Sequence, residues 1–399
     1  MRTRLLLALI AAPAFAAQTL NGLWDATVVV NQVEIPFRIE LSATKDGVAG
    51  AFFNGEERVR STAGAFEQSS LRLQFAHYAT ALEATLGDDG RLSGTYGRAG
   101  RLYPFRAKRF EPVPSEAGDV PSIAGLWEIP TKSPKGESAW RLFVRQSGAE
   151  VTAAILRVDG DTGELSGAWR NGRFVLSHFS GARPSLLEVT PKSDGTLDLL
   201  QNGKNRLTAL RVADARAKGL PEPSDPSRHT SVKDPTEPFR FSGTDLAGKP
   251  VNETDARFQG KVVLVNISGS WCPNCHDEAP FLASLYRKYR DRGLEIVTLS
   301  FEEAEQLANP TRLKAFIAQY GLEHTVLLGG EQSQVLERLP QAVNLNTWPA
   351  TFFLGRDGRV RSVHAGFAGK ATGEAHTKLV AELTHTVERL LAESVVSAR

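Results

Sequence analysis

The chain has 399 residues, of which 41% are hydrophobic and 23% charged, a balance typical of packed domains rather than of a disordered protein. Its 47 basic and 45 acidic residues leave a formal net charge of +2, without the positive excess that marks a nucleic-acid-binding protein. At roughly 100–200 residues per domain, this length predicts two or three domains. We therefore expect a multidomain protein that has no nucleic acid partner.

The first residues have the pattern of an export signal. Arg2 and Arg4 precede an apolar run over 5–12, and Ala14-Phe15-Ala16 provides the small residues that a signal peptidase accepts. That run is too short to span a bilayer as a mature helix, and no later stretch is long and apolar enough. We expect a cleaved signal peptide over 1–16, a periplasmic or otherwise extracytoplasmic location and no stable membrane insertion. An uncleaved anchor is the alternative.

Short alternating runs of apolar and polar residues occupy the chain from Leu20 to about Val212. Turn triplets that end in glycine, such as Asp88-Asp89-Gly90, separate these runs. Alternation with a period of two, broken by such turns, is typical of antiparallel β-strands. The N-terminal half is therefore predicted to be an antiparallel all-β region.

An internal repeat divides this β-region. Gly22-Leu23-Trp24 recurs 103 residues later as Gly125-Leu126-Trp127. Gly50–Gly55 resembles Gly167–Gly172 at the larger offset of 117 residues, which predicts about one additional hairpin in the second copy. We expect two duplicated β-units that form two small barrels, or two halves of one barrel or sandwich. The expected units span residues 17–112 and 113–212.

The pattern changes after the β-region. Prolines punctuate a polar stretch at 213–236, which predicts a semi-extended linker. Beyond it, at 237–399, strand-like apolar runs alternate with helical patterns, which predicts an α/β sheet covered on both faces. The chain closes with an amphipathic helix that places Leu379, Leu383 and Val387 on one face. The expected strands are 261–267, 294–300, 324–328, 350–354 and 360–364, and the other expected helices are 272–292 and 310–320.

The chain contains two cysteines, Cys272 and Cys275, separated by Pro273 and Asn274. They follow the strand-like run at 261–267 and open a helical pattern, which places Cys272 at the start of a helix. The unpaired backbone N–H groups and the positive end of the dipole at such a start stabilise a thiolate. Pro273 suits the first helical position because it has no N–H to leave unpaired. Cys275, one turn further on, is close enough to attack a mixed disulfide at Cys272, which predicts dithiol–disulfide exchange.

Four segments in the C-terminal region occur in a linked order: Phe239–Pro250, Gly260–Asn266, the run Trp271–Pro280 with the pattern Trp-Cys-x-x-Cys-x-x-Glu-x-Pro, and Trp348–Phe352. Together they resemble the thioredoxin superfamily, and within it the TlpA/ResA-like branch of extracytoplasmic disulfide reductases. The resemblance implies a thioredoxin fold for this region and the activity of a thiol–disulfide oxidoreductase, with a reductase favoured over an oxidase. A linked set of this kind is specific, whereas a lone Cys-x-x-Cys is not.

The resemblance also implies roles for individual residues. Cys272 and Cys275 would form a redox-active disulfide, and Glu278 would help to move the proton of the resolving Cys275 thiol. A solvated helix residue is the alternative for Glu278. The peptide bond before Pro349 would be cis, and Pro280 would kink the active-site helix. The residues expected to border the substrate are Trp271, Pro273, Asn274, Trp348 and Pro349.

The same resemblance implies partners and a cellular role. Protein thiols and disulfides would be the substrates, and a membrane thiol relay would supply electrons, in cell redox homeostasis and cytochrome c biogenesis. No cofactor and no metal are expected. Two residues depart from the family pattern, because Asn266 occupies the position of the buried acid of thioredoxins and Trp348 stands where a smaller residue is usual before the proline.

Two other interpretations remain open. The run Cys272-Pro-Asn-Cys-His276 also fits the c-type haem attachment pattern, although the only methionine is Met1, which leaves no methionine as a second axial ligand in a mature chain. Alternatively, the β-region is a module that binds a ligand or partner and carries a redox-sensing thioredoxin-like domain. Zinc binding is disfavoured, since two further ligands at suitable spacing are not found in the sequence.

Overall fold

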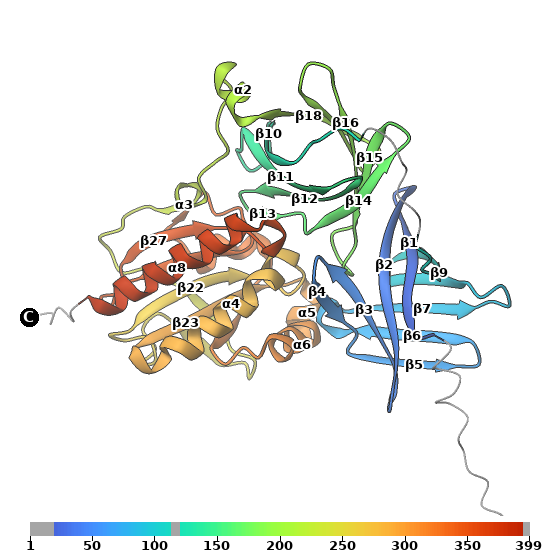
Figure 1. Cartoon of the computed structure of the whole chain (residues 1–399). Coiled ribbons are helices and arrows are strands. Elements are labelled where there is room, and N and C mark those ends of the chain that lie inside the picture. Colours follow the sequence, from blue (N-terminus) through green and yellow to red (C-terminus); the bar gives the residue numbers. More distant parts are fainter. Residues whose placement is uncertain (1–19, 113–119, 394–399) are drawn as a thin grey trace, which may run out of the picture. The chain divides into compact units, whose positions relative to one another are not determined.

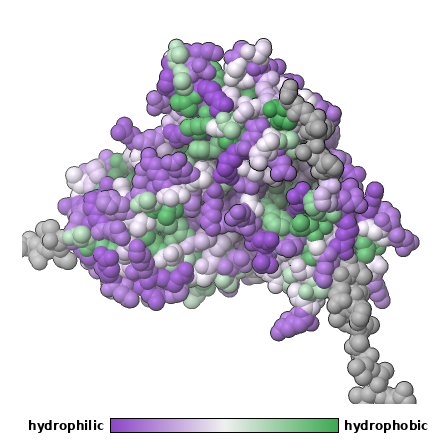
Figure 2. Space-filling view, in the orientation of Figure 1, coloured by the Kyte–Doolittle hydropathy of each residue, from purple (hydrophilic) through white to green (hydrophobic). Residues whose placement is uncertain are grey.

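A computed structural model describes residues 20–112 and 120–393. The expected signal peptide at 1–16 lies outside the described residues. Hydrophilic residues cover most of the face drawn in Figure 2, in keeping with the balanced composition. None of the described helices is long and apolar enough to cross a bilayer. Two compact units make up the chain: Met1–Ser115 with Ser177–Pro184, and Glu116–Leu176 with Ser185–Arg399.

The first unit is built on a nine-stranded antiparallel sheet (Figure 1). Its strands are β1 (Gly22–Val30), β2 (Val33–Thr44), β3 (Gly47–Asn54), β4 (Glu57–Arg60), β5 (Ala63–Glu67), β6 (Ser70–Phe75), β7 (Thr80–Leu86), β8 (Leu92–Arg98) and β9 (Arg101–Arg109), with the 3-10 helix η1 (Ala76–Tyr78) between β6 and β7. They lie in the order β4-β3-β2-β1-β9-β8-β7-β6-β5. Leu71, Leu73 and Phe75 of β6 are all buried, because alternate side chains of a strand point to the same face.

A second nine-stranded antiparallel sheet opens the second unit. Its strands are β10 (Gly125–Pro130), β11 (Ala139–Ser147), β12 (Glu150–Arg157), β13 (Gly160–Asp161), β14 (Leu165–Arg170), β15 (Arg173–His178), β16 (Ser185–Pro191), β17 (Leu197–Gln201) and β18 (Asn205–Arg211). Because β11 pairs with both β10 and β12, eight of them close into a barrel, and β13 pairs with β12 outside the ring. Apolar side chains such as Trp127, Leu142 and Phe174 form the barrel core.

The duplication is confirmed strand by strand. When β1 is matched to β10, the second sheet repeats the strand order of the first, and β3 and β12 begin 103 residues apart, as β1 and β10 do. In each copy the indole N–H of the repeated tryptophan donates to the carbonyl four residues earlier, at 2.9 Å for Trp24 and 2.8 Å for Trp127. An arginine of the last strand, Arg109 or Arg211, lies over that indole ring.

The expectation of an additional hairpin in the second copy is wrong. Among the described residues, each strand of the first sheet has one counterpart in the second, with β4 matched by β13 and β5 by β14. The similar segments Gly50–Gly55 and Gly167–Gly172 therefore belong to strands that are not equivalent, β3 and β14. They resemble each other because both lead into an Asn-Gly turn, a local signal that recurs at hairpins.

Short regular elements occur in the stretch expected to be a linker. They are α2 (Val212–Ala217), α3 (Pro226–His229) and β19 (Ser231–Val232). Asp225 caps α3 by accepting a hydrogen bond from the Ser227 N–H at 2.9 Å, and β19 pairs with β25 (Ala342–Val343). The boundaries placed at 213 and 236 stay predictions.

A mixed seven-stranded sheet forms the thioredoxin-like fold. Its strands are β20 (Ser242–Thr244), β21 (Pro250–Asn252), β22 (Val262–Ser268), β23 (Leu294–Phe301), β24 (Thr325–Gly330), β26 (Ala350–Leu354) and β27 (Val360–Ala365), in the order β21-β20-β24-β23-β22-β26-β27. The helices are α4 (Pro273–Tyr289), η2 (Arg290–Arg292), α5 (Ala304–Ala308), α6 (Thr311–Tyr320), η3 (Gln332–Gln334), α7 (Val335–Arg338), η4 (Lys370–Thr372) and α8 (Glu374–Ala392). β22 runs parallel to β23 and antiparallel to β26. The predicted thioredoxin-type α/β arrangement is confirmed.

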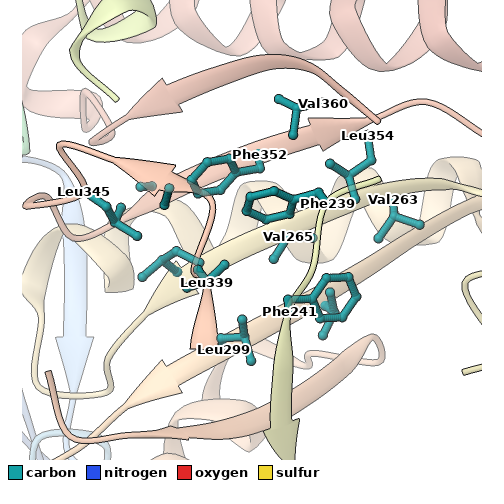
Figure 3. Close-up of a cluster of buried hydrophobic side chains, with 14 of the residues drawn as sticks. Phe239, Phe241, Val263, Val265, Leu299, Leu339, Leu345, Phe352, Leu354 and Val360 are labelled. Carbon is teal, nitrogen blue, oxygen red and sulfur yellow. The ribbon is translucent and has the colours of Figure 1, made fainter. Parts of the chain in front are cut away.

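Both faces of this sheet are buried. On one face, α4 and α8 pack against Val262, Leu264 and Phe353. On the other, Phe239, Phe241 and Leu339 belong to the cluster drawn in Figure 3 together with side chains of the central strands. Every residue of β22 is buried, as is every residue of its neighbour β26, so the turn that follows β22 starts from a fully buried strand.

Candidate active site

The two cysteines lie where β22 turns into α4. Cys272 is the N-cap residue of α4, and Pro273 is its first helical residue. The Cys275 N–H donates both to the Cys272 carbonyl oxygen at 3.0 Å and to the Cys272 sulfur at 3.3 Å, so the sulfur shares a backbone donor of the first helical turn. The predicted strand-to-helix junction is therefore confirmed. This geometry directs a backbone N–H of the first helical turn at the Cys272 sulfur.

The loop before β26 lies against the same sulfur. The Trp348–Pro349 peptide bond is cis, as the resemblance implied. The Cys272 thiol donates to the Trp348 carbonyl oxygen at 3.4 Å. Cys272 is only 3% exposed and Cys275 only 1%, and both are free thiols. The sulfur expected to attack thus lies between the helix start and the cis-proline loop, and the sulfur expected to resolve lies one turn further into α4.

The Cys275 thiol is held in its protonated form. Burial is the largest cause that raises its pKa well above the ordinary value, and the hydrogen bond with the Cys272 side chain raises it further. Ser268 acts in the opposite sense, and the charge of Glu278 adds to the increase. Cys275 therefore needs a proton acceptor before it can attack a disulfide.

Glu278 follows Cys275 by one helical turn and is buried, with 3% exposure, so the alternative of a solvated helix residue is wrong. Burial raises the pKa of Glu278 to about 8, although hydrogen bonds with Asn266 and Thr351 act to lower it. Asn266 donates to one carboxylate oxygen at 2.8 Å, and the Thr351 hydroxyl donates to the other at 3.3 Å. A carboxyl group that changes protonation near neutral pH is suited to general acid–base work.

The hydrogen-bonding groups around Glu278 were mostly missed by the sequence analysis. Asn266 pairs across the sheet with Thr351 on β26 and with Thr298 on β23, and its side chain contacts both threonine hydroxyls. Thr298 in turn lies 3.0 Å from Nε2 of His324, whose pKa burial lowers to about 4, so that its ring is neutral. The available signal was the presence of polar residues within three largely apolar strands.

A buried ion pair supports the turn that precedes Cys272. The Glu302 carboxylate accepts hydrogen bonds from both the N–H and the hydroxyl of Ser270, each at 2.8 Å. The Arg312 guanidinium binds Glu302 at 2.7 Å and Ser270 at 2.8 Å, and it also pairs with Glu303. Burial alone would lower the pKa of Arg312, but its hydrogen bonds with Glu303 and Glu302 raise it. This cluster fixes the backbone two residues before the attacking sulfur.

Replacing Arg312 with methionine should lower the free energy of unfolding by about 3–5 kcal/mol, because Glu302 would be left as a buried charge without its cation. Urea denaturation with a brief thiol-labelling pulse measures this locally, since both cysteines lie in the thioredoxin-like fold. The control Arg290→Met breaks an exposed pair with Glu323 and should cost less than about 1 kcal/mol. Equal losses in the two variants would contradict the assignment.

The residues expected to border the substrate gather around Cys272. The rings of Trp271 and Trp348 lie 6.2 Å apart, and both side chains are partly exposed. The Trp271 indole N–H donates to the Phe301 carbonyl at 2.8 Å, whereas the buried Trp348 indole N–H has no hydrogen-bond partner in the described part of the chain. Their contact with a substrate stays a prediction. Pro280 lies inside α4, as expected.

The haem interpretation is not favoured by the position of His276. Its side chain is buried, with Nδ1 2.9 Å from the Tyr320 hydroxyl and Nε2 2.9 Å from the Ser270 carbonyl. Both ring nitrogens are thus engaged within the fold, next to the ion-pair cluster. An axial haem ligand needs one of these nitrogens free.

A sheet of this type that presents a Cys-x-x-Cys at a helix start, beside a cis-proline, defines the class of thioredoxin-fold thiol–disulfide proteins. Residues 235–363 match the AhpC/TSA family model. The thiol-disulfide oxidoreductase ResA of Bacillus thuringiensis subsp. konkukian is 32% identical over 142 residues, which cover 35% of this chain and 74% of that protein. The chain belongs to the family of ResA-like thiol–disulfide oxidoreductases.

The chain is also similar to a second curated protein and to a solved structure. The thiol-disulfide oxidoreductase ResA of Bacillus subtilis is 29% identical over 136 residues, which cover 34% of this chain and 69% of that protein. A thiol:disulfide interchange protein of the thioredoxin family from Chlorobium tepidum, of known crystal structure, shares 23% identity, with a TM-score of 0.31 over 41% of this chain and all of that one.

Proposed function

We propose that this protein is an extracytoplasmic disulfide reductase that acts on protein substrates, with Cys272 as the attacking sulfur. The observation that carries the proposal is the position of Cys272 at the N-cap of α4, where its sulfur accepts a hydrogen bond from the Cys275 N–H, with the Cys275 thiol one turn further into the fold. An extracytoplasmic location is supported by the signal-like pattern of the first residues.

The proposed reaction has two exchanges. The Cys272 thiolate attacks one sulfur of a substrate disulfide; the S–S bond breaks, a mixed disulfide forms, and the other substrate sulfur leaves as a thiolate that takes up a proton. Glu278 then accepts the proton of Cys275, whose sulfur attacks Cys272 and releases the second substrate thiol. The substrate disulfide is reduced and the Cys272–Cys275 pair is oxidised.

A further electron donor completes the cycle. The Cys272–Cys275 disulfide must be reduced again by an external dithiol, and we assign this step to a membrane thiol relay. Such a reductase can keep selected protein thiols reduced in an oxidising compartment, including those needed for cytochrome c biogenesis. The apolar core of the barrel favours a scaffold or partner-binding role for the β-region over a small-molecule site inside the barrel.

A trapping experiment tests the proposal. In the Cys275→Ser variant the second exchange is blocked, so the reduced protein mixed with insulin should accumulate a mixed disulfide that mass spectrometry maps to Cys272. Cys272→Ser/Cys275→Ser is the matched control and should trap nothing. If the single variant captures no insulin chain under conditions where dithiothreitol does reduce insulin, the proposed attack by Cys272 is wrong.

A further inference from the structure

The barrel contacts the Cys-x-x-Cys segment through residues 158–161, which follow β12 and include the short strand β13; they are called the 158–161 turn below. The Asn274 side-chain amide, between the two cysteines, donates to the Asp159 carbonyl at 2.8 Å. Asn274 and Asp159 are 115 residues apart in the chain, and both belong to the second unit. The Cys-x-x-Cys segment is therefore bonded to a part of the chain outside the thioredoxin-like fold.

The same turn covers the loop that follows β27. The Asp161 carboxylate, which is buried, accepts a hydrogen bond from the Gly369 N–H at 2.5 Å. All four residues of the loop, Gly366–Gly369, are buried. A Cβ atom added to Gly160 would lie 2.5 Å from Asn274 Cγ and 2.7 Å from the Phe367 carbonyl oxygen, so the turn fits the site with no space to spare.

Other hydrogen bonds hold the turn in place. The Glu137 carboxylate, also buried, accepts a hydrogen bond from the Val158 N–H at 2.7 Å, and Lys135 forms an ion pair with Asp159. Asp161 additionally accepts from the Gly163 N–H at 2.7 Å. Buried carboxylates thus hydrogen-bond to backbone N–H groups at both ends of the turn. These bonds hold the turn in one position, unlike the tip of an exposed hairpin.

The two tryptophans beside Cys272 offer a substrate a partly exposed aromatic surface and a hydrogen-bond donor. Trp271 and Trp348 are partly exposed there, and the Trp348 indole N–H is buried without a partner among the described residues. A buried donor without a partner is costly in a native protein, and a substrate carbonyl would satisfy it.

We propose that the 158–161 turn is a specificity-determining wall of the active site. It closes the side formed by Asn274 and Gly366–Gly369, so that disulfides reach Cys272 only past Trp271 and Trp348. Disulfides in extended or unfolded protein segments fit this one-sided approach, whereas those on the surface of folded proteins are rejected. The inference rests on the proposed function and adds the class of substrate.

Access to Cys272 can be measured without any disulfide exchange. In a Cys275→Ser background Cys272 is the only thiol, and its alkylation rates by iodoacetamide and by a bulky polymer-linked maleimide give a bulky-to-small ratio. Gly160→Ala should force the turn away from Asn274, and Asp161→Ala should release it from Gly369. A hydrogen bond to a charged group is stronger than one between neutral groups, and loss of such a bond should displace the turn in a correspondingly larger fraction of molecules. We therefore expect the bulky-to-small ratio to rise about tenfold in each variant.

Two matched controls separate this effect from general damage to the barrel. Gly172→Ala also adds a side chain at a positive φ, of 82°, but its Cβ would meet nothing within 4 Å. Asp194→Ala also removes a turn carboxylate that accepts a backbone N–H, that of Thr196 at 3.0 Å, in an exposed turn. Neither control should change the ratio.

The alkylation results test the wall independently of the proposed reductase function. A raised ratio in either wall variant, with unchanged controls, supports the wall even if Cys272 and Cys275 never exchange with a substrate. An unchanged ratio in folded wall variants overturns it, and so does equal slowing towards both reagents, since the turn would then only support the site. In the Cys275-containing protein, the wall variants should gain activity on a folded disulfide protein relative to a short disulfide peptide.

Discussion

Replacing Cys272 with alanine should reduce disulfide reduction by this protein to the rate of the uncatalysed reaction. The substitution removes the only sulfur that lies at a helix start and faces the cis-proline loop. Cys275 cannot replace it, because its pKa is raised well above the ordinary value, chiefly by burial. The rate of insulin reduction, with dithiothreitol as electron donor, measures the effect.

The Cys275→Ser variant is the control for this experiment. Reduced beforehand and mixed with insulin in the absence of dithiothreitol, it should form one mixed disulfide per molecule and then stop, whereas Cys272→Ala should form none. Both variants keep a small side chain at a buried position, so their folded structures should be similar. Full turnover by Cys272→Ala would overturn the assignment of the attacking sulfur.

Replacing Glu278 with glutamine should change both the pH dependence of stability and the second exchange step. The pKa of Glu278 is about 8 in the fold, against an ordinary value of 4.5. Between these pH values the folded protein retains a proton that the unfolded chain has released, so stability falls as pH rises, by about 1.4 kcal/mol per unit. The total loss is on the order of 5 kcal/mol by pH 8.

Glutamine does not ionise, so the free energy of unfolding of the variant should not fall between pH 5 and pH 8. Over the same range that of the parent should fall, so the variant gains stability relative to the parent as the pH rises. It also cannot accept the Cys275 proton, and the second exchange should slow by about 10²–10⁴-fold near neutral pH. Urea denaturation at several pH values and rapid-mixing kinetics of mixed-disulfide resolution measure the two effects. The control Glu305→Gln, at an exposed helix position, should alter neither. An unchanged stability slope in Glu278→Gln would refute the buried carboxyl assignment.

The redox site could be predicted because its signals are local in the sequence. The Cys-x-x-Cys lies directly between a run of apolar residues and a helical pattern, and Pro273 marks the first helical position. A strand buried along its whole length and a capped helix start follow from those patterns alone. The expected helix at 310–320 is likewise present, as α6, and Gly321 follows it in the left-handed conformation.

What could not be predicted depends on pairing between distant segments. The partners of Glu278 are set by the register of β22 with β26, which places Asn266 opposite Thr351. The contact between Asn274 and Asp159 depends on how the barrel packs against the thioredoxin-like fold, which no spacing in the sequence encodes. The expectation of an additional hairpin, by contrast, failed because it relied on a local signal. The Asn-Gly turns at the ends of Gly50–Gly55 and Gly167–Gly172 are too common at hairpins to identify equivalent strands.

The most direct test of the account is a redox titration of the intact protein. After equilibration in glutathione or dithiothreitol buffers, rapid acid quenching and alkylation, mass spectrometry gives the fraction of chains that contain a Cys272–Cys275 disulfide. We predict a single two-electron transition with a potential below about −150 mV, nearer to the value of about −270 mV for thioredoxin than to the value of about −120 mV for the oxidant DsbA. A higher potential would make the protein an oxidant, and the absence of any disulfide between these two sulfurs at every potential would contradict the account altogether.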